Sequence, residues 1–309
     1  MIRDRTKAAS YQERCDLDVS DADDVEERLI RWGSEREAVR VVLLTSTRAI
    51  PHAEVDGFSD YDTVLVVRDV LPFATDRGWI ADFGDVLVAY WDPFEPNADS
   101  GLEQLGNVTW YVDRPRIDFT VWPVALLERI TATLELPAEL DAGYRVLLDK
   151  DGLTAGLPTP TYAAYVPAPP AEATYLATVN DFFVGAPSVA VGLLRDDLLP
   201  ARWVLDCDMK HVYLLQMLQW RMECEHGWAE PARALGKGLR KGLPADVWRE
   251  LQGTYAGGTT TDNWEALFRT MALFGQVARD VGDRLGYAYP DELDERVTTY
   301  VRRMRDQGH

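Results

Sequence analysis

The sequence predicts an α+β protein of two domains, and three observations lead to this prediction. The chain has 309 residues, which is enough for two domains of about 150 residues each. Short β-branched and aliphatic runs typical of buried strands occur before residue 150, whereas apolar residues recur at helical spacing after residue 171. A proline-rich, weakly charged segment separates the two halves. We therefore expect a mixed-sheet domain at 1–151, a linker at 152–170 and a helical bundle at 171–309.

The elements of the first half follow from composition and from start and stop signals. Ser20 suits an N-cap and acidic residues follow it, so a helix is expected to begin there, and Gly33 is expected to end it. A second helix is predicted at Pro72–Phe83. The predicted strands are Val39–Leu44, Thr63–Val67, Val86–Trp91, Val108–Val112, Ile117–Val121 and Tyr144–Leu148. The fourth and fifth strands should form a hairpin.

Helical spacing continues through the second half of the chain. Prolines, which are favoured in the first turn of a helix, stand near three of the expected helix starts. The predicted helices cover about 171–185, 200–225, 244–255, 262–285 and 290–306.

The net charge of −19 restricts the possible partners. An acidic surface repels nucleic acid and anionic membranes, so we expect neither as a partner. The same surface attracts cationic ligands, although acidity also serves solubility alone. With no long apolar run and a charged N-terminus, a soluble, cytoplasmic protein is expected. The three scattered cysteines indicate neither a disulfide framework nor a zinc site.

Three aspartates form the strongest chemical signal. Asp60 and Asp62 precede the strand at Thr63–Val67, and their spacing puts both carboxylates on one side of an extended chain. Asp118 lies in a second strand between apolar neighbours. Carboxylates of this kind hold Mg²⁺, and two ions about 3.5–4 Å apart can activate a hydroxyl and stabilise a leaving pyrophosphate. A lone Asp-x-Asp is more often a solvated turn, but the third carboxylate and the hydroxyl-rich loop after the first strand favour a metal site.

The stretch from Val41 to Val67 resembles the Gly-Ser and Asp-x-Asp signature of the polymerase-β-like nucleotidyltransferases. From about residue 25 to 305 the chain more specifically resembles the aminoglycoside 6-adenylyltransferases, which inactivate streptomycin. The matching pieces of the first half are Phe58–Asp62, Asp76–Ile80, Arg116–Asp118 and Leu147–Asp151. Those of the second half are Met217–Trp220, Gly236–Lys237, Leu243–Pro244, Thr254–Tyr255, Trp264–Ala266 and Leu285–Tyr287.

The resemblance implies a Mg²⁺-dependent enzyme that transfers AMP from ATP to a hydroxyl of a cationic aminoglycoside, streptomycin foremost. It implies that Asp60, Asp62 and Asp118 are catalytic and hold one or two Mg²⁺ ions. The nucleotide-binding residues that it implies are Ser46, Thr47, Arg48, Lys237 and Tyr255.

One departure from the family pattern concerns the phosphate loop. The family has Gly-Ser where this chain has Ser46-Thr47. Glycine allows a positive φ and close approach of the backbone to phosphate, and Ser46 adds a Cβ at that point. We expect weaker or re-oriented nucleotide binding from this change.

The remaining candidates concern the acceptor. Asp92 and Glu95 follow a predicted strand and are candidates for the general base on the acceptor hydroxyl. Asp181 and Asp197 on the helical domain are candidates for binding guanidinium groups, since carboxylate and guanidinium match in bidentate geometry. Single acidic residues such as these are more often plain surface charges. Trp91 and Trp110 are candidates to line a sugar pocket.

Two other functions stay open at the level of sequence. One keeps the chemistry but changes the acceptor to another metabolite or a protein side chain. The other is a non-catalytic protein that binds a cationic ligand, although the intact carboxylates argue against it. Turnover of the ATP α-phosphate separates the binding protein from the enzymes.

Overall fold

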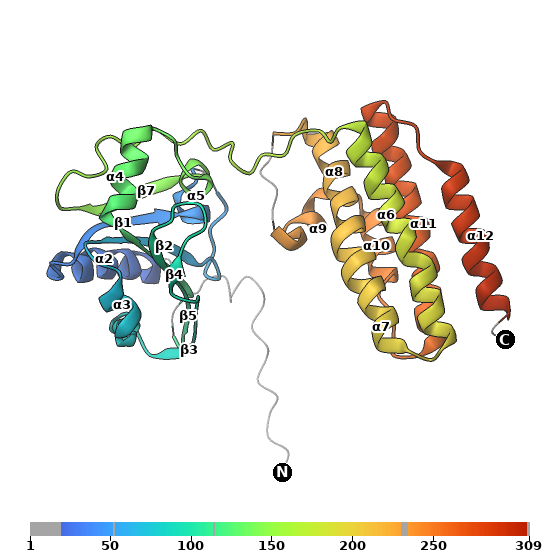
Figure 1. The fold of residues 1–309 in the computed structure, drawn as a ribbon, viewed down its shortest axis with the longest axis horizontal. Coiled ribbons are helices and arrows are strands. Elements are labelled where there is room, and N and C mark those ends of the chain that lie inside the picture. Colours follow the sequence, from blue (N-terminus) through green and yellow to red (C-terminus); the bar gives the residue numbers. More distant parts are fainter. Residues whose placement is uncertain (1–19, 52, 114, 230–233, 308–309) are drawn as a thin grey trace, which may run out of the picture. The chain divides into compact units, whose positions relative to one another are not determined.

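A mixed sheet and a set of packed helices form separate parts of the chain (Figure 1). The computed structural model describes residues 20–51, 53–113, 115–229 and 234–307. The chain divides into two units, Met1–Tyr165 and Val166–His309. Strands occur in the first unit and helices dominate the second, so the predicted α+β class is confirmed.

The sheet of the first unit has strand order β3-β5-β6-β2-β1-β7, and β4 pairs with β5. β2 and β6 run parallel, whereas the other neighbouring strands are antiparallel, including the predicted β5–β6 hairpin. The strands are β1 (Val39–Thr45), β2 (Tyr61–Val67), β3 (Val86–Trp91), β4 (Glu95–Pro96), β5 (Glu103–Tyr111), β6 (Ile117–Pro123) and β7 (Tyr144–Asp149).

Helices cover the two faces of this sheet unequally. One face packs against α2 (Ser20–Glu35), α3 (Leu71–Thr75) and the 3₁₀ helix η2 (Gly78–Phe83). The other face packs against α4 (Val124–Thr133) and α5 (Ala138–Asp141). On this second face the apolar core, which includes Leu43, Val64 and Trp122, gives way to polar side chains at Thr45, Asp62 and Asp118. The candidate site lies at this transition.

Two predicted helices of the first unit end differently from expectation. α2 does not stop at Gly33 but continues to Glu35. A Cβ at Gly33 would lie 3.0 Å from side-chain atoms of Leu148 and Val42, so this glycine permits close packing of the helix on the sheet. The helix predicted at Pro72–Phe83 is broken, because Asp76 is extended and its carboxylate accepts a hydrogen bond from the Gly78 amide at 3.0 Å.

The segment after β7 packs with the first unit as far as Tyr165. Leu153 and Leu157 pack against the core beneath α4, and the Tyr144 hydroxyl donates to the Pro158 carbonyl at 3.0 Å. The boundary between the units therefore lies within the proline-rich segment 152–170.

The second unit contains a helix in each predicted region, with different bounds. The helices are α6 (Glu172–Leu194), α7 (Leu198–Arg202), α8 (Leu215–His226), α9 (Leu239–Gly242), α10 (Ala245–Gly253), α11 (Thr260–Leu285) and α12 (Asp291–Gln307), with a 3₁₀ turn η4 (Ala234–Gly236). A π-helical segment, η3 (Trp203–Leu214), joins α7 to α8. The prediction of one regular helix over 200–225 is therefore wrong, because the helical path changes from α to π and back to α. α6 continues through Pro187 and ends at Leu194, nine residues beyond its predicted end at 185.

The core of the second unit forms between α6 and α11. The rings of Phe182 and Phe274 stack with their centroids 3.6 Å apart, and the Tyr175 hydroxyl donates to the Ala278 carbonyl at 2.8 Å. α6 is long and apolar enough to cross a membrane by length and composition alone. Here one side of that helix is buried against its neighbours in the unit.

Candidate active site

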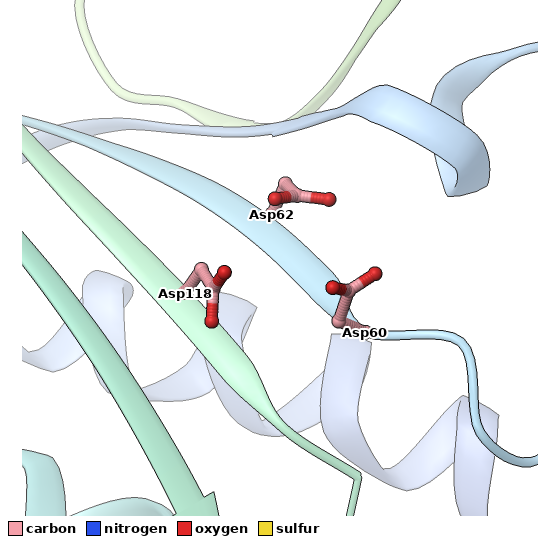
Figure 2. A group of neighbouring side chains, drawn as sticks. All are labelled: Asp60, Asp62 and Asp118. Atoms are coloured by element: carbon pink, nitrogen blue, oxygen red, sulfur yellow. The ribbon is translucent and has the colours of Figure 1, made fainter. Parts of the chain in front are cut away.

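The three predicted aspartates lie together on the sheet (Figure 2). Parallel pairing of β2 with β6 places Asp62 directly beside Asp118, and Asp60 precedes Asp62 by two residues and projects to the same side. One carboxylate oxygen of each residue lies within 4.8 Å of the others. The side chains of Asp60 and Asp118 are 25% and 23% exposed, so the cluster is reachable from solvent.

Burial and mutual repulsion make this cluster electrostatically unfavourable when it holds no cation. The pKa of Asp118 is raised to about 6, chiefly by partial burial and also by the charges of Asp62 and Asp60, against the lowering effect of Arg116. A raised carboxyl pKa means that ionisation of Asp118 opposes folding. The native state holds these carboxylates at a cost that a bound cation would remove.

We expect Asp118→Asn to raise the melting temperature of the metal-free protein at pH 8. The folded-state pKa of about 6 lies above that of an unfolded aspartate, so the ionised group destabilises the native state at any pH above that value. As the pH falls through this window the penalty fades, and the gain from asparagine should be smaller at pH 5. Thermal melts in chelator at both pH values test this, and a lower melting temperature at pH 8 would contradict it.

The predicted phosphate loop lies beside the carboxylates. It forms the 3₁₀ helix η1 (Ser46–Ala49) directly after β1, whose last residue, Thr45, is opposite Asp62. Ser46 has φ +58°, in the left-handed region that favours glycine. The backbone conformation at position 46 therefore favours the glycine that the family pattern has there.

Arg48 contacts the chain where β2 begins, next to Asp60 and Asp62. Its guanidinium donates to the carbonyls of Ser59 and Asp60 at 2.9 and 3.0 Å and lies 3.7 Å from the ring centroid of Tyr61. These contacts fix the start of β2, which bears Asp62, and they use two of the guanidinium nitrogens. A direct contact of Arg48 with phosphate stays a prediction.

Asp92 and Glu95 both belong to the face that carries Asp118. Glu95 pairs with Gln104 on β5, and a Cβ at Gly106 would lie only 1.9 Å from the Asp92 carboxylate. Gln104, Gly106 and Val108 are every second residue of β5, so they lie on the same face of the sheet. Val108 is the β5 neighbour of Asp118. Asp92 is thus the nearer of the two along β5. Within the described part of the chain its carboxylate has no hydrogen bond or ion pair.

The tryptophans considered for a sugar pocket are on opposite faces. Trp91 packs into the core beneath α3, against Trp79. Trp110 is 49% exposed. It is two residues after Val108 on β5, so it lies on the same face as Asp118. Of the two, Trp110 is the one able to contact an acceptor near the carboxylates.

Four predicted site residues belong to the second unit, whereas the carboxylates belong to the first. Lys237 is exposed and lines a small cavity with Trp220 and Glu223. The Tyr255 ring is exposed and has the Lys210 ammonium 4.7 Å from its centroid. Their reach to a nucleotide stays a prediction.

Asp181 and Asp197 are not brought together. Both are exposed, and Asp181 lies within α6 while Asp197 follows its end. Leu194, the last residue of α6, is 13 residues after Asp181, a distance of about 20 Å along the helix. One small cation therefore cannot contact both carboxylates.

Comparisons with known proteins place the chain in a family. A family model described as streptomycin adenylyltransferase matches residues 20–304. The chain is similar to the aminoglycoside 6-adenylyltransferases of Campylobacter jejuni (26% identity, 90% of this chain and 93% of the relative) and Bacillus subtilis strain 168 (28%, 86% and 91%). A crystal structure of an aminoglycoside 6-adenyltransferase from Bacillus subtilis aligns over 91% of this chain and 97% of its own, with 23% identity and a TM-score of 0.43. Because the family model covers nearly the whole chain, the protein belongs to the streptomycin adenylyltransferase family.

Proposed function

We propose that this protein transfers AMP from ATP to a hydroxyl group of an aminoglycoside, with streptomycin as the leading acceptor. The observation that carries the proposal is the carboxylate cluster of Asp60, Asp62 and Asp118 beside a phosphate loop. Family membership and two relatives named aminoglycoside 6-adenylyltransferase support the choice of reaction. An intracellular site of action accords with ATP as the donor.

The residues of the cluster fit Mg²⁺. All three offer carboxylate oxygens, the ligands that this hard cation prefers, and they are close enough to share an ion. Asp60, Asp62 and Asp118 would hold it. When bound, the metal supplies positive charge that offsets the triphosphate and acidifies the attacking hydroxyl.

The chain's own residues account for orientation and proton transfer. The Thr47 hydroxyl and the backbone amides near Ser46 donate to phosphate oxygens, and Arg48 keeps β2 in register with that loop. Asp92 accepts the proton of the acceptor hydroxyl, because it is on the face of the cluster and has no competing partner in the described residues. The acceptor oxygen then attacks the α-phosphorus in line, and pyrophosphate leaves. Lys237 and Tyr255 of the second unit are proposed to contact the triphosphate.

An acceptor panel tests the proposal. The full-length protein is incubated with ATP labelled at the α-phosphate, with Mg²⁺ or with chelator, and with streptomycin, a second aminoglycoside or a neutral sugar. We expect label on streptomycin only when Mg²⁺ is present, and weaker acceptor binding as salt screens the acidic surface. Label on another acceptor would overturn the choice of streptomycin. Acceptor binding without any turnover would overturn the enzymatic assignment in favour of a binding protein.

Ser46→Gly is expected to lower the KM for ATP. A serine in the left-handed region is strained by about 1–2 kcal/mol, and its Cβ restricts approach of the loop amides to within about 3 Å of phosphate oxygens. Only strain that increases when the loop closes on phosphate affects ATP binding, and its relief corresponds to a reduction in the KM of up to roughly tenfold for each 1.4 kcal/mol. The KM for the acceptor should stay unchanged in steady-state assays. Thr47→Ala, which removes a donor, should raise the KM for ATP, and a rise for Ser46→Gly as well would show that the serine hydroxyl is itself a ligand.

A further inference from the structure

Arg116 extends its guanidinium group into the carboxylate cluster. Its backbone is fixed at the start of β6, where its carbonyl accepts the Tyr61 amide at 3.0 Å. Its Nη2 atom is hydrogen-bonded to the Asp60 carboxylate, and its Nε atom lies 3.0 Å from Asp118 Oδ1. One positive group thus contacts two of the three aspartates proposed to hold the metal.

The contact with Asp118 supplies charge without a hydrogen bond. Arg116 Nε and Asp118 Oδ1 are both buried, yet neither has a hydrogen-bond partner among the residues that the structure describes. Buried charged atoms left in this state cost free energy. Arg40 shows the alternative in the same unit, because its Nε and Nη2 atoms form a two-pronged hydrogen-bonded pair with the Asp151 carboxylate. The Arg40 pair satisfies both partners, and the Arg116 contact does not.

The Arg116 guanidinium that contacts the carboxylates also lies beside an aromatic ring on the same face. The guanidinium carbon lies 5.6 Å from the ring centroid of Trp110, within the range of a cation–π contact. The Arg116 side chain is 29% exposed, so it can move without disrupting the core. A guanidinium displaced from the carboxylates would therefore still have the Trp110 ring beside it.

We propose that Arg116 is a resident counter-ion, which neutralises Asp60 and Asp118 in the metal-free protein and is displaced from them when the metal ion binds. This inference rests on the proposed function, because it needs the three aspartates to be metal ligands. Its consequence is that a divalent ion alone competes with the guanidinium and binds weakly. An ion that arrives with a triphosphate adds negative charge to which the displaced guanidinium is attracted, so metal and nucleotide bind cooperatively.

Metal affinity without nucleotide tests the inference directly. Mn²⁺ is titrated into the full-length protein without ATP, and free Mn²⁺ is measured by electron paramagnetic resonance. Arg116→Met keeps the length of the side chain and removes its charge. Because a unit charge within a few ångströms of the ion is lost, Mn²⁺ should bind at least about tenfold more tightly than to the wild type. Arg116→Lys keeps the charge and should restore weak binding.

Thermal melts supply an independent readout. In chelator Arg116→Met should melt at a lower temperature than the wild type, since the carboxylates lose their counter-ion, and Mn²⁺ should restore the difference. Arg145→Met is the matched control, because Arg145 pairs with Glu26 of α2 on the other face of the sheet. Mn²⁺ should not change the difference between this control and the wild type.

Unchanged or weaker Mn²⁺ binding by Arg116→Met would overturn the inference. A loss of ATP affinity with the metal affinity unaltered would also overturn it, because that result would make Arg116 a phosphate ligand. Failure of the proposed function looks different. In that case Asp62→Asn would bind Mn²⁺ as the wild type does, whereas under the proposed function it binds more weakly whatever the role of Arg116.

Discussion

Asp60→Asn and Asp62→Asn should each lower kcat/KM for adenylyl transfer by about three powers of ten or more. Asparagine has nearly the size of aspartate but lacks the charge with which the cluster holds a divalent cation. The metal's charge stabilisation amounts to several kcal/mol, and each 1.36 kcal/mol corresponds to tenfold in rate. The fold should be unaffected, because both side chains are partly exposed at the start of β2 and outside the apolar cores.

A matched control separates loss of the metal from loss of any negative charge. Asp85 is an exposed aspartate before β3 in the same unit, and Asp85→Asn should keep wild-type turnover. Labelled-ATP kinetics, circular dichroism and Mn²⁺ titration on the three variants give the comparison. Turnover near the wild-type rate in either Asp60→Asn or Asp62→Asn would remove the metal role from that residue.

The neighbourhood of the carboxylates illustrates what local sequence can predict. The two-residue spacing of Asp60 and Asp62 is a local property, and it predicted two side chains on one side of the chain. The proximity of Asp118 depends on the parallel pairing of β2 with β6, which brings together segments more than 50 residues apart. No local pattern specifies that pairing, so the strand pattern offered Asp118 as a third candidate ligand without fixing its distance from the other two.

Glycine signals were ambiguous for a physical reason. The absence of a side chain serves helix termination, a positive φ and close packing equally well. Gly33 resembles a helix stop but serves packing against Leu148, and Gly106 gave no signal although Asp92 lies across it.

The sequence between Pro123 and Gly143 gave no prediction of secondary structure, although α4 and α5 form there and α4 covers β2 and β6.

Arg116 shows how a residue with a proposed role escapes sequence reasoning. It precedes Asp118 by two residues, so alternation along a strand places it on the same side as the carboxylates. That signal was present within a segment already matched to the family. Its meaning depends on the distance to Asp60, which lies on another part of the chain and becomes visible only in the folded sheet.

The second large effect concerns the proposed base, and Gly106 allows Asp92 to be displaced without being removed. A Cβ at Gly106 would lie 1.9 Å from Asp92 Oδ2, and this atom is the end of an exposed side chain that can rotate away. Gly106→Ala should therefore keep the fold and move the carboxylate from its place on β5. A positioned general base contributes about 10²–10⁴-fold, so we expect Asp92→Asn to lower kcat by at least about 10²-fold. Gly106→Ala should cause a loss approaching that of Asp92→Asn.

The double variant decides whether the alanine acts through Asp92. If it does, Gly106→Ala should cost little further activity in the Asp92→Asn background, because the two changes remove one and the same interaction. Gly156→Ala is the matched control, since a Cβ there meets Thr131 at an ordinary 3.5 Å, and it should leave kcat unchanged. Steady-state kcat for the four variants and the wild type, with melts to verify folding, completes the cycle. Additive losses in the double variant would mean that Gly106 affects activity through the backbone of β5. Full activity in Asp92→Asn would transfer the role of base to another carboxylate on this face, and Glu95 is the next one along β5.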